Sequence, residues 1–221
     1  MVIKQTFLNH KGGVYIYRLH EPKLKRLCKE NGFSRLKQYL ESVFNECPNE
    51  LFNNGPRGSC LKFQLIDELN NISGHEVSSL AKLGLDVNKD RFRDNHSKVQ
   101  VCMLENDKNT VAMEVPIWLD PKELAAYEHV FQSKENLTGH IDILRIENGC
   151  VWIWDYKPNA QKEKYAATQV FFYALMLSKR TGIPLEEFRC GYFDQHYSYL
   201  FKPSESFLLK LNKQESLKTS F

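Results

Sequence analysis

The sequence lacks the patterns that define several classes of protein. Its six cysteines form no CxxC pair, so neither a local zinc site nor a dense disulfide framework is predicted. No apolar run approaches the roughly 18 residues that a membrane-spanning helix needs. No Walker A sequence is present, which argues against a fused P-loop ATPase or helicase. The formal net charge is only +3, so a polyanionic partner is permitted but not required.

Apolar and aromatic side chains, in contrast, are plentiful. Hydrophobic residues make up 42% of the 221 positions, and there are 14 Phe, 10 Tyr and 3 Trp. This composition suits one globular domain with a sizeable core and argues against a disordered chain. The N-terminal stretch, MVIKQTFLNHK, is too polar for a secretory signal. We therefore expect a soluble, intracellular, cytoplasmic protein with reduced cysteines.

The first 89 residues are predicted to form a mainly helical N-terminal region that carries no catalytic pattern. This region is also the part of the chain that we expect to recruit any protein partner. Residues 12–20 alternate like a strand, and residues 47–60 read as a loop. Helices are predicted where apolar residues recur at helical spacing, over residues 21–31, 34–44, 61–69 and 77–83.

Residues 90–205 predict an α/β (α+β) core, a mixed sheet flanked by helices. In order, we expect a helix over 90–105, a strand over 110–118, a hairpin over 139–157, a helix over 161–180, and strands over 188–193 and 197–201. In the strand over 110–118, the predicted apolar face consists of Val111, Met113, Val115 and Ile117. Residues 206–221 read as a C-terminal tail.

The hairpin is the most informative segment. The Asn-Gly pair at 148–149 is the strongest short-range signal for a two-residue hairpin loop. If these residues form the loop, Asp142 lies directly opposite Asp155 on the neighbouring strand. Side chains at directly opposite positions are roughly 5 Å apart, and like charges there are destabilising. The pair therefore predicts that a positive charge lies between the two carboxylates.

A divalent metal ion with Lys157 beside it meets that need. The same register puts Lys157 and His140 on the face that carries Asp142 and Asp155. Carboxylate oxygens suit Mg²⁺ or Mn²⁺, and a nearby lysine can orient or deprotonate a water molecule. The alternative is a solvated face with simple ion pairs. It fits poorly, because the face also carries the apolar side chains of Leu144, Ile146, Val151 and Ile153.

The order of these residues resembles the PD-(D/E)XK nucleases. Gly-His-Ile-Asp142, then Trp-Asp155-Tyr-Lys157, then Gln169-Val-Phe-Phe-Tyr173 follow the pattern GxxD, DxK and QxxxY. The similarity spans about residues 90–205 and looks like the RecB-type branch, which includes CRISPR-associated exonucleases. It implies a restriction-endonuclease-like fold in which Asp142 and Asp155 hold the metal ion and Lys157 assists attack by water.

The helix after the hairpin carries the last of these motifs. Gln169 and Tyr173 are four residues apart and share one helix face. The resemblance implies that they position the active site or the nucleic-acid strand. Without it, Tyr173 would read as a core residue.

A further metal ligand is expected upstream of the hairpin. His96 resembles the helix histidine of the RecB-type branch, although a lone histidine on an apolar face is more often structural. Glu114 is the alternative if its strand face turns toward the hairpin, and Glu105 is the weakest candidate. The iron–sulfur members of the branch have a cysteine cluster after the QxxxY helix, where this chain has only Cys190, so no cluster is expected.

Together these features predict a metal-dependent nuclease that hydrolyses phosphodiester bonds, with DNA favoured over RNA and exonuclease-like cleavage. Asp142, Asp155, Lys157, Gln169 and Tyr173 form the predicted catalytic set. The rival interpretations are a non-catalytic nucleic-acid-binding module on the same fold, a protein-interaction scaffold, and a hydrolase of another phosphate ester.

Overall fold

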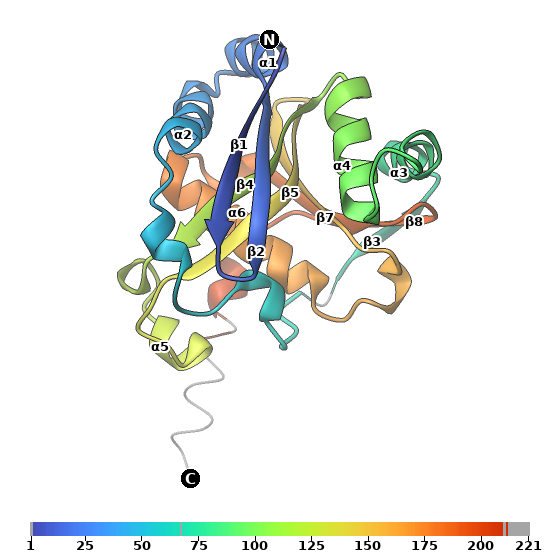
Figure 1. Cartoon of the computed structure of the whole chain (residues 1–221). Coiled ribbons are helices and arrows are strands. Elements are labelled where there is room, and N and C mark those ends of the chain that lie inside the picture. Colours follow the sequence, from blue (N-terminus) through green and yellow to red (C-terminus); the bar gives the residue numbers. More distant parts are fainter. Residues whose placement is uncertain (1, 67, 210, 212–221) are drawn as a thin grey trace.

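One mixed sheet organises the structure. The computed structural model describes residues 2–66, 68–209 and 211. Its strands are β1 (Ile3–His10), β2 (Gly13–His20), β3 (Asn70–Ser73), β4 (Thr110–Leu119), β5 (Leu137–Glu147), β6 (Cys150–Tyr156), β7 (Phe188–Phe193) and β8 (Tyr197–Phe201). They form an eight-stranded sheet in the order β1-β2-β4-β5-β6-β7-β8-β3 (Figure 1). All neighbours are antiparallel except β6 and β7.

Helices cover both faces of this sheet. They are α1 (Glu21–Asn31), α2 (Ser34–Asn45), α3 (Glu76–Val87), α4 (Asn95–Asn106), α5 (Tyr127–Phe131) and α6 (Ala166–Thr181). Helix α6 links the parallel pair β6 and β7 and packs across β4 to β7. On β6, the adjacent residues Ile153 and Trp154 enter two different core clusters, one with α6 and one with α3 and α4. The predicted α/β fold of restriction-endonuclease type is confirmed.

Helix ends follow the local sequence closely. Gly32 and Gly182 adopt left-handed φ values of 76° and 67° at the C-termini of α1 and α6, as their positions after the apolar periodicity predict. Helix α4 begins at Asn95 rather than at residue 90. The reason is that the Asp94 side chain caps it by accepting a hydrogen bond from the Ser97 N–H at 2.7 Å.

The helix predicted over residues 61–69 is wrong. Residues 61–66 and 68–69 are non-helical. Leu61, Leu65 and Ile66 are buried in the core, as their apolar spacing suggested. The Leu65 N–H, however, donates to the Thr168 hydroxyl on α6 at 2.9 Å, so tertiary packing overrides the local helical signal.

The first 89 residues belong to the same sheet as the rest. They contribute β1, β2 and β3 as well as α1, α2 and α3. Strands β1 and β2 form a hairpin at one edge of the sheet, and β3 pairs with β8 at the other. The predicted domain division after residue 89 stays a prediction, but the sheet runs across it.

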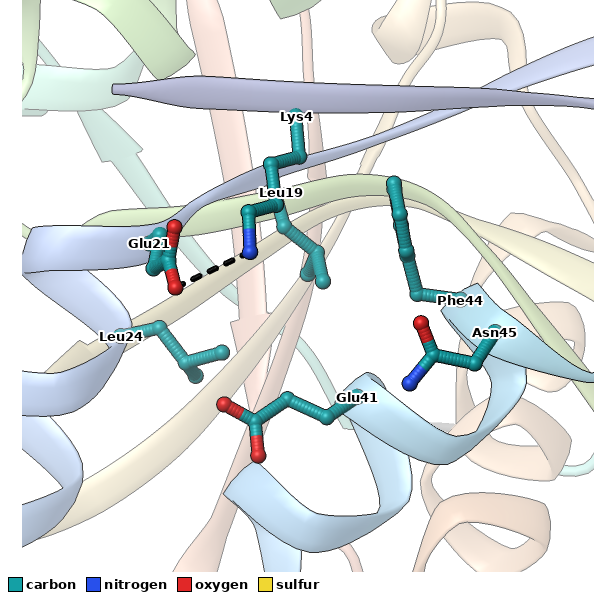
Figure 2. Close-up of a pocket in the computed structure, with 7 residues that line it drawn as sticks. All are labelled: Lys4, Leu19, Glu21, Leu24, Glu41, Phe44 and Asn45. Atoms are coloured by element: carbon teal, nitrogen blue, oxygen red, sulfur yellow. Dashed lines mark ion pairs between the residues drawn. The ribbon is translucent and has the colours of Figure 1, made fainter. Parts of the chain in front are cut away.

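The β1–β2 hairpin has one packed face. Tyr17 is completely buried, and its hydroxyl donates to the Leu40 carbonyl of α2 at 2.9 Å. A recess of about 160 Å³ lies between the hairpin and helices α1 and α2. Figure 2 shows the Lys4–Glu21 ion pair, 3.0 Å long, beside this recess. Both of its side chains are about half exposed, so the pair adds little stability.

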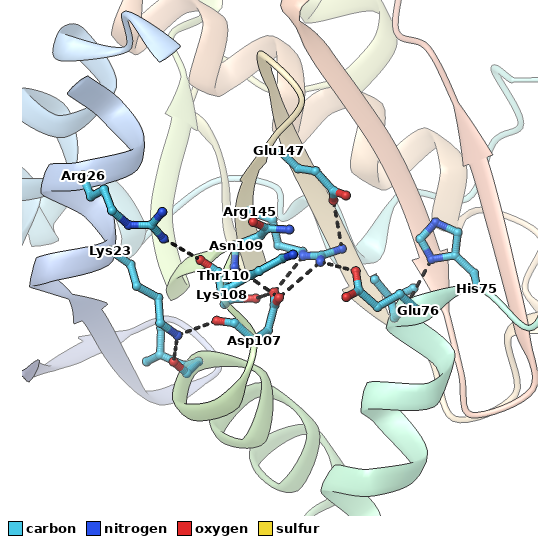
Figure 3. Close-up of polar contacts among 12 residues, drawn as sticks. Lys23, Arg26, His75, Glu76, Asp107, Lys108, Asn109, Thr110, Arg145 and Glu147 are labelled. Carbon is cyan, nitrogen blue, oxygen red and sulfur yellow. Dashed lines mark hydrogen bonds and ion pairs between the residues drawn. The ribbon is translucent and has the colours of Figure 1, made fainter. Parts of the chain in front are cut away.

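A buried arginine ties β5 to the α4–β4 turn and to α3. Arg145 is completely buried, and its Nε lies 2.8 Å from Asp107 Oδ2 (Figure 3). Glu76 at 2.7 Å and Glu147 at 3.4 Å complete the carboxylates around the guanidinium. Asp107 also accepts a hydrogen bond from the Thr110 hydroxyl at 2.5 Å. The two fully buried charges, Arg145 and Asp107, are therefore matched one to one and hydrogen-bonded, whereas Glu76 and Glu147 are partly exposed.

Two remaining expectations concern the tail and membranes. Of the predicted tail over 206–221, residues 206–209 and 211 are helical, and the remainder lies outside the described residues. Across the described part of the chain, no helix combines the length and apolar character needed to span a membrane.

Candidate active site

The β5–β6 hairpin has the register predicted from its sequence. Glu147 pairs with Cys150, and the ladder continues to Ile143 opposite Trp154. Asp142 and Asp155 follow at the next position, where the regular ladder ends. The Tyr156 N–H donates to Asp142 Oδ2 at 3.0 Å, so the Asp142 carboxylate reaches across to β6. The hairpin thus brings both predicted aspartates to the point where the strands separate.

Glu114 joins them from β4. Met113 pairs with Ile143 and Val115 with Ile141, so Glu114 lies beside Asp142 on the adjacent strand. Its φ is +54°, a left-handed conformation that is uncommon for a residue with a Cβ and that often marks a functional site. The conformation also breaks the alternation of β4. Met113 packs in a small separate cluster, and the predicted common face with Val115 is wrong there.

Helix α4 approaches the carboxylates with two side chains one turn apart. His96 Nε2 lies 3.9 Å from Asp142 Oδ2, and the imidazole packs edge-on against Tyr156. Gln100 donates to Glu114 Oε1 at 2.7 Å. Both upstream candidates, His96 and Glu114, therefore face the same aspartate, and neither excludes the other.

Lys157, Gln169 and Tyr173 form one hydrogen-bonded chain with Asp155. Lys157 Nζ lies 2.7 Å from Asp155 Oδ2 and donates to Gln169 Oε1 at 3.2 Å. The Gln169 amide nitrogen donates to Asp155 Oδ1 at 3.1 Å and to the Tyr173 hydroxyl at 3.0 Å. The Gln169 amide is thus fully used, and it fixes the lysine and the aspartate relative to each other.

Glycines make room for the Tyr173 ring. A Cβ on Gly139 would lie 2.4 Å from Tyr173 Cε1, and one on Gly58 would lie 2.6 Å from the same atom. Tyr173 therefore lies against two stretches of backbone that carry no side chain. The contact with Tyr173 explains, through packing, why position 139, three residues before Asp142, is a glycine.

Two of the three carboxylates, Asp142 and Glu114, have raised pKa values. For Asp142, burial and the neighbouring Asp155 raise the pKa to about 7. For Glu114, burial and Asp142 raise the pKa to about 8, although the Gln100 hydrogen bond opposes this. Burial alone would lower the pKa of Lys157, but Asp155 and Asp142 outweigh it and the pKa is raised. Three carboxylates thus share one lysine, which leaves an excess of buried negative charge.

A sequence model of the PD-(D/E)XK nuclease superfamily matches residues 80–215. This span includes the three carboxylates and Lys157, and the helix residues His96, Gln100, Gln169 and Tyr173. The chain belongs to the PD-(D/E)XK nuclease superfamily. A comparison with curated proteins finds no match. Among solved structures, the one titled "Crystal structure of SSO0001" is 12% identical over 83% of this chain and 84% of that chain, with a TM-score of 0.36.

PD-(D/E)XK nucleases typically use divalent metal ions, so the fit of this site matters. No three His, Cys, Asp or Glu side chains within the described residues are gathered in an arrangement that could hold a metal ion. The donor set nevertheless fits a hard cation, because Glu114, Asp142 and Asp155 offer oxygen atoms. Repulsion between neighbouring carboxylates contributes, together with burial, to the raised pKa values of Glu114 and Asp142. A bound cation would offset this repulsion.

The candidate Glu105 and the neighbouring strand residue His140 have other partners. Glu105 pairs in bidentate fashion with Arg91, at 2.8 Å for each contact, outside the carboxylate group. His140 does share the strand with Asp142, but it is buried, stacked on Tyr15 at 3.7 Å and bonded to His10 at 2.8 Å. These contacts connect the β1–β2 hairpin to β5.

The sequence did not identify several residues near the site. Val14, Ile16 and Arg18 of β2 face His96, Ser97 and Gln100 of α4 across a cleft of about 360 Å³, which Glu114 also lines. Gln100 carried a detectable signal, since it follows His96 by four residues on one helix. Arg57, which donates to the Tyr15 hydroxyl, comes from a loop with no such periodicity.

Proposed function

We propose that this protein is a metal-dependent nuclease that hydrolyses phosphodiester bonds of nucleic acid, with Mg²⁺ or Mn²⁺ as cofactor. The observation that carries the proposal is the buried excess of negative charge formed by Glu114, Asp142 and Asp155 beside Lys157. Buried like charges are costly and persist where they serve a function. The RecB-like motif order supports DNA as the substrate and exonuclease-like cleavage.

The roles of the side chains follow from their contacts. Asp142 and Asp155 would hold the metal ion, aided by Glu114 or His96. Once bound, the ion would polarise the scissile phosphate and promote ionisation of a water molecule. Lys157 is held protonated by its two aspartate neighbours, so it orients water and stabilises negative charge rather than removing a proton.

Gln169 and Tyr173 act as positioning residues. Gln169 bonds both Lys157 and Asp155, and Tyr173 holds the Gln169 amide from the other side. Loss of the Gln169 side chain would leave Lys157 held by Asp155 alone, so that its ammonium group would be positioned less precisely. Such misplacement of a catalytic group lowers turnover more than substrate binding.

The test is cleavage of end-labelled DNA, single-stranded and double-stranded, linear and circular, with Mg²⁺ or Mn²⁺. We expect the wild type to cut and Asp155→Ala to be inactive. Lys157→Ala should lose about 10²–10³ in kcat, the range seen when one transition-state-stabilising group is removed. Lys162→Ala is the matched control, since this exposed lysine lies on the turn after the hairpin.

Preference for linear over circular DNA would support exonuclease-like cleavage. A wild type that binds DNA but does not cut DNA or RNA under any metal condition would contradict the nuclease proposal. That result would favour a non-catalytic nucleic-acid-binding module on the same fold.

A further inference from the structure

The β1–β2 hairpin has two faces of opposite character. Its inner face is packed, with Leu8, Tyr17 and Leu19 buried against the core. Its outer face exposes Phe7 and Val14, with 63% and 64% of their surfaces accessible. Large exposed apolar side chains side by side are unusual unless they contact something. The fold itself does not require them.

This outer face forms a wall of the active-site cleft. Strand β2 pairs with β4 only at Arg18–Met113 and Leu19–Ala112, and the rest of β2 separates from β4. Along the separated part, Val14 and Ile16 line the cleft that also contains Glu114. Phe7 pairs directly with Ile16, so its side chain extends the same apolar face. The wall therefore runs from exposed surface to Glu114, which lies beside Asp142 on the neighbouring strand.

Arg18 adds a positive charge to this wall. It lies on the same face as Ile16 and is a diagonal neighbour of Phe7, a separation of about 7–8 Å in an antiparallel pair. Its Nε donates to Gln5 at 3.1 Å, and it forms no ion pair with the residues that the structure describes. A cation next to an apolar platform matches the two parts of a nucleotide, its phosphate and its base.

We propose that the outer face of the β1–β2 hairpin holds a single nucleic-acid strand and leads it to the carboxylates of Asp142 and Asp155. The inference rests on the proposed nuclease function and names its substrate class. Bases of a single strand expose their flat faces, which stack on aromatic side chains, whereas a duplex presents mainly phosphates. Phe7 receives a base and Arg18 contacts an adjacent phosphate.

The hairpin is fixed in place for this task. His10 bonds His140 at 2.8 Å and stacks on Phe52 at 4.0 Å, and Tyr15 stacks on His140. All these contacts are on the inner side, where His10 and His140 are buried. These inner contacts hold the outer face at a defined position and leave the side chains of Phe7 and Val14 exposed, so strand binding needs little rearrangement.

The test measures binding without cleavage. Fluorescence anisotropy of a labelled oligothymidylate and of a labelled duplex of equal length is recorded in EDTA, with the full chain. Phe7→Ala should weaken single-strand binding by about 5- to 150-fold, the cost of one lost stacking contact. Phe7→Trp should retain it. The control is Leu83→Ala, an exposed apolar residue on α3, which should change nothing.

The charge is tested in the same assay. Arg18→Gln should weaken single-strand binding and reduce the slope of log affinity against log salt by about 1. Arg26→Gln is the matched control, because this exposed arginine on α1 pairs with Glu30 away from the cleft. Equal slopes for the two variants would contradict the role of Arg18.

Several results would overturn the proposal. The first is equal single-strand affinity of Phe7→Ala and Leu83→Ala. The second is a duplex affinity that equals the single-strand affinity and falls by the same factor in Phe7→Ala. The third is that the wild type does not bind the oligothymidylate. Each is distinguishable from failure of the nuclease function. An inactive wild type whose single-strand binding is lost in Phe7→Ala would refute the nuclease function and support strand binding by the hairpin. Active cleavage that Phe7→Ala leaves unchanged would support the nuclease function and refute strand binding by the hairpin.

Discussion

Strand β5 carries two buried charge clusters within three residues of each other, and their charges are balanced differently. Around Arg145, the guanidinium bonds one fully buried carboxylate, Asp107, and the two other carboxylates, Glu76 and Glu147, are partly exposed to solvent. Around Asp142, three carboxylates share one lysine, Lys157, and the partly exposed His96 lies 3.9 Å from Asp142. The first arrangement stabilises its charges where they are. The second arrangement has too little positive charge for its carboxylates, which is the condition under which a site can bind a cation.

The pKa directions of the two clusters express the same contrast. Burial would raise the pKa of Asp107, but Arg145 and the Thr110 hydroxyl lower it below its usual value. Burial and Asp155 together raise the pKa of Asp142 to about 7. Two aspartates buried in one fold thus shift in opposite directions, because one has a cation beside it and the other has an anion.

Removal of the cation from the matched cluster should have the largest effect. Arg145→Met leaves the buried carboxylate of Asp107 without its cation, and we expect a loss of about 3–5 kcal/mol in the free energy of unfolding. Urea denaturation measures this loss. Arg91→Ala, which breaks an exposed pair with Glu105, is the control and should cost about 0–1 kcal/mol. Similar losses in both variants would mean that the Arg145 cluster is not a special stabilising element.

The same substitution in the two clusters should act with opposite sign. In the absence of metal at pH 8, Asp142→Asn removes repulsion while keeping an acceptor for the Tyr156 N–H, and should stabilise the fold by about 1–3 kcal/mol. Asp107→Asn breaks charged hydrogen bonds to Arg145 and should destabilise it by about 1.5–3 kcal/mol. Thermal and urea unfolding of both variants measure the two changes in stability. Destabilisation by both substitutions would contradict the expected difference between the two clusters.

Acid should weaken the matched cluster gradually, the smallest of these effects. The folded pKa of Asp107 is below its unfolded value of about 3.9, so its stabilising contribution is fully present above that pH. It is lost as the pH falls through the folded pKa. The stability difference between wild type and Asp107→Asn should therefore be constant near neutral pH and shrink below about pH 4. A difference that stays constant in acid would contradict the pairing.

The sequence predicted the site where local rules operate. The Asn-Gly turn at 148–149 and strict alternation determine the hairpin register, so Asp142 and Asp155 could be assigned to one end of it without a structure. His96 is predicted from its resemblance to the helix histidine of the RecB-type branch. The resemblance to the nuclease motifs supplied Gln169 and Tyr173.

Long-range packing explains what could not be predicted. The left-handed conformation of Glu114 breaks the alternation of β4, and nothing in its neighbouring residues signals it. Leu65 looked helical, but its N–H bonds a side chain more than a hundred residues away. The β1–β2 hairpin joins β4 through only two residue pairs, a contact that no local pattern specifies.

The most direct test of the charge contrast is calorimetric titration with Mn²⁺ at pH 8. Wild type and Asp107→Asn are expected to bind the ion, because both retain the unmatched carboxylates of the site. Asp142→Asn is expected to lose most of the binding, although it removes the same charge from the same fold. Equal binding by all three proteins, or no binding by the wild type, would contradict the account.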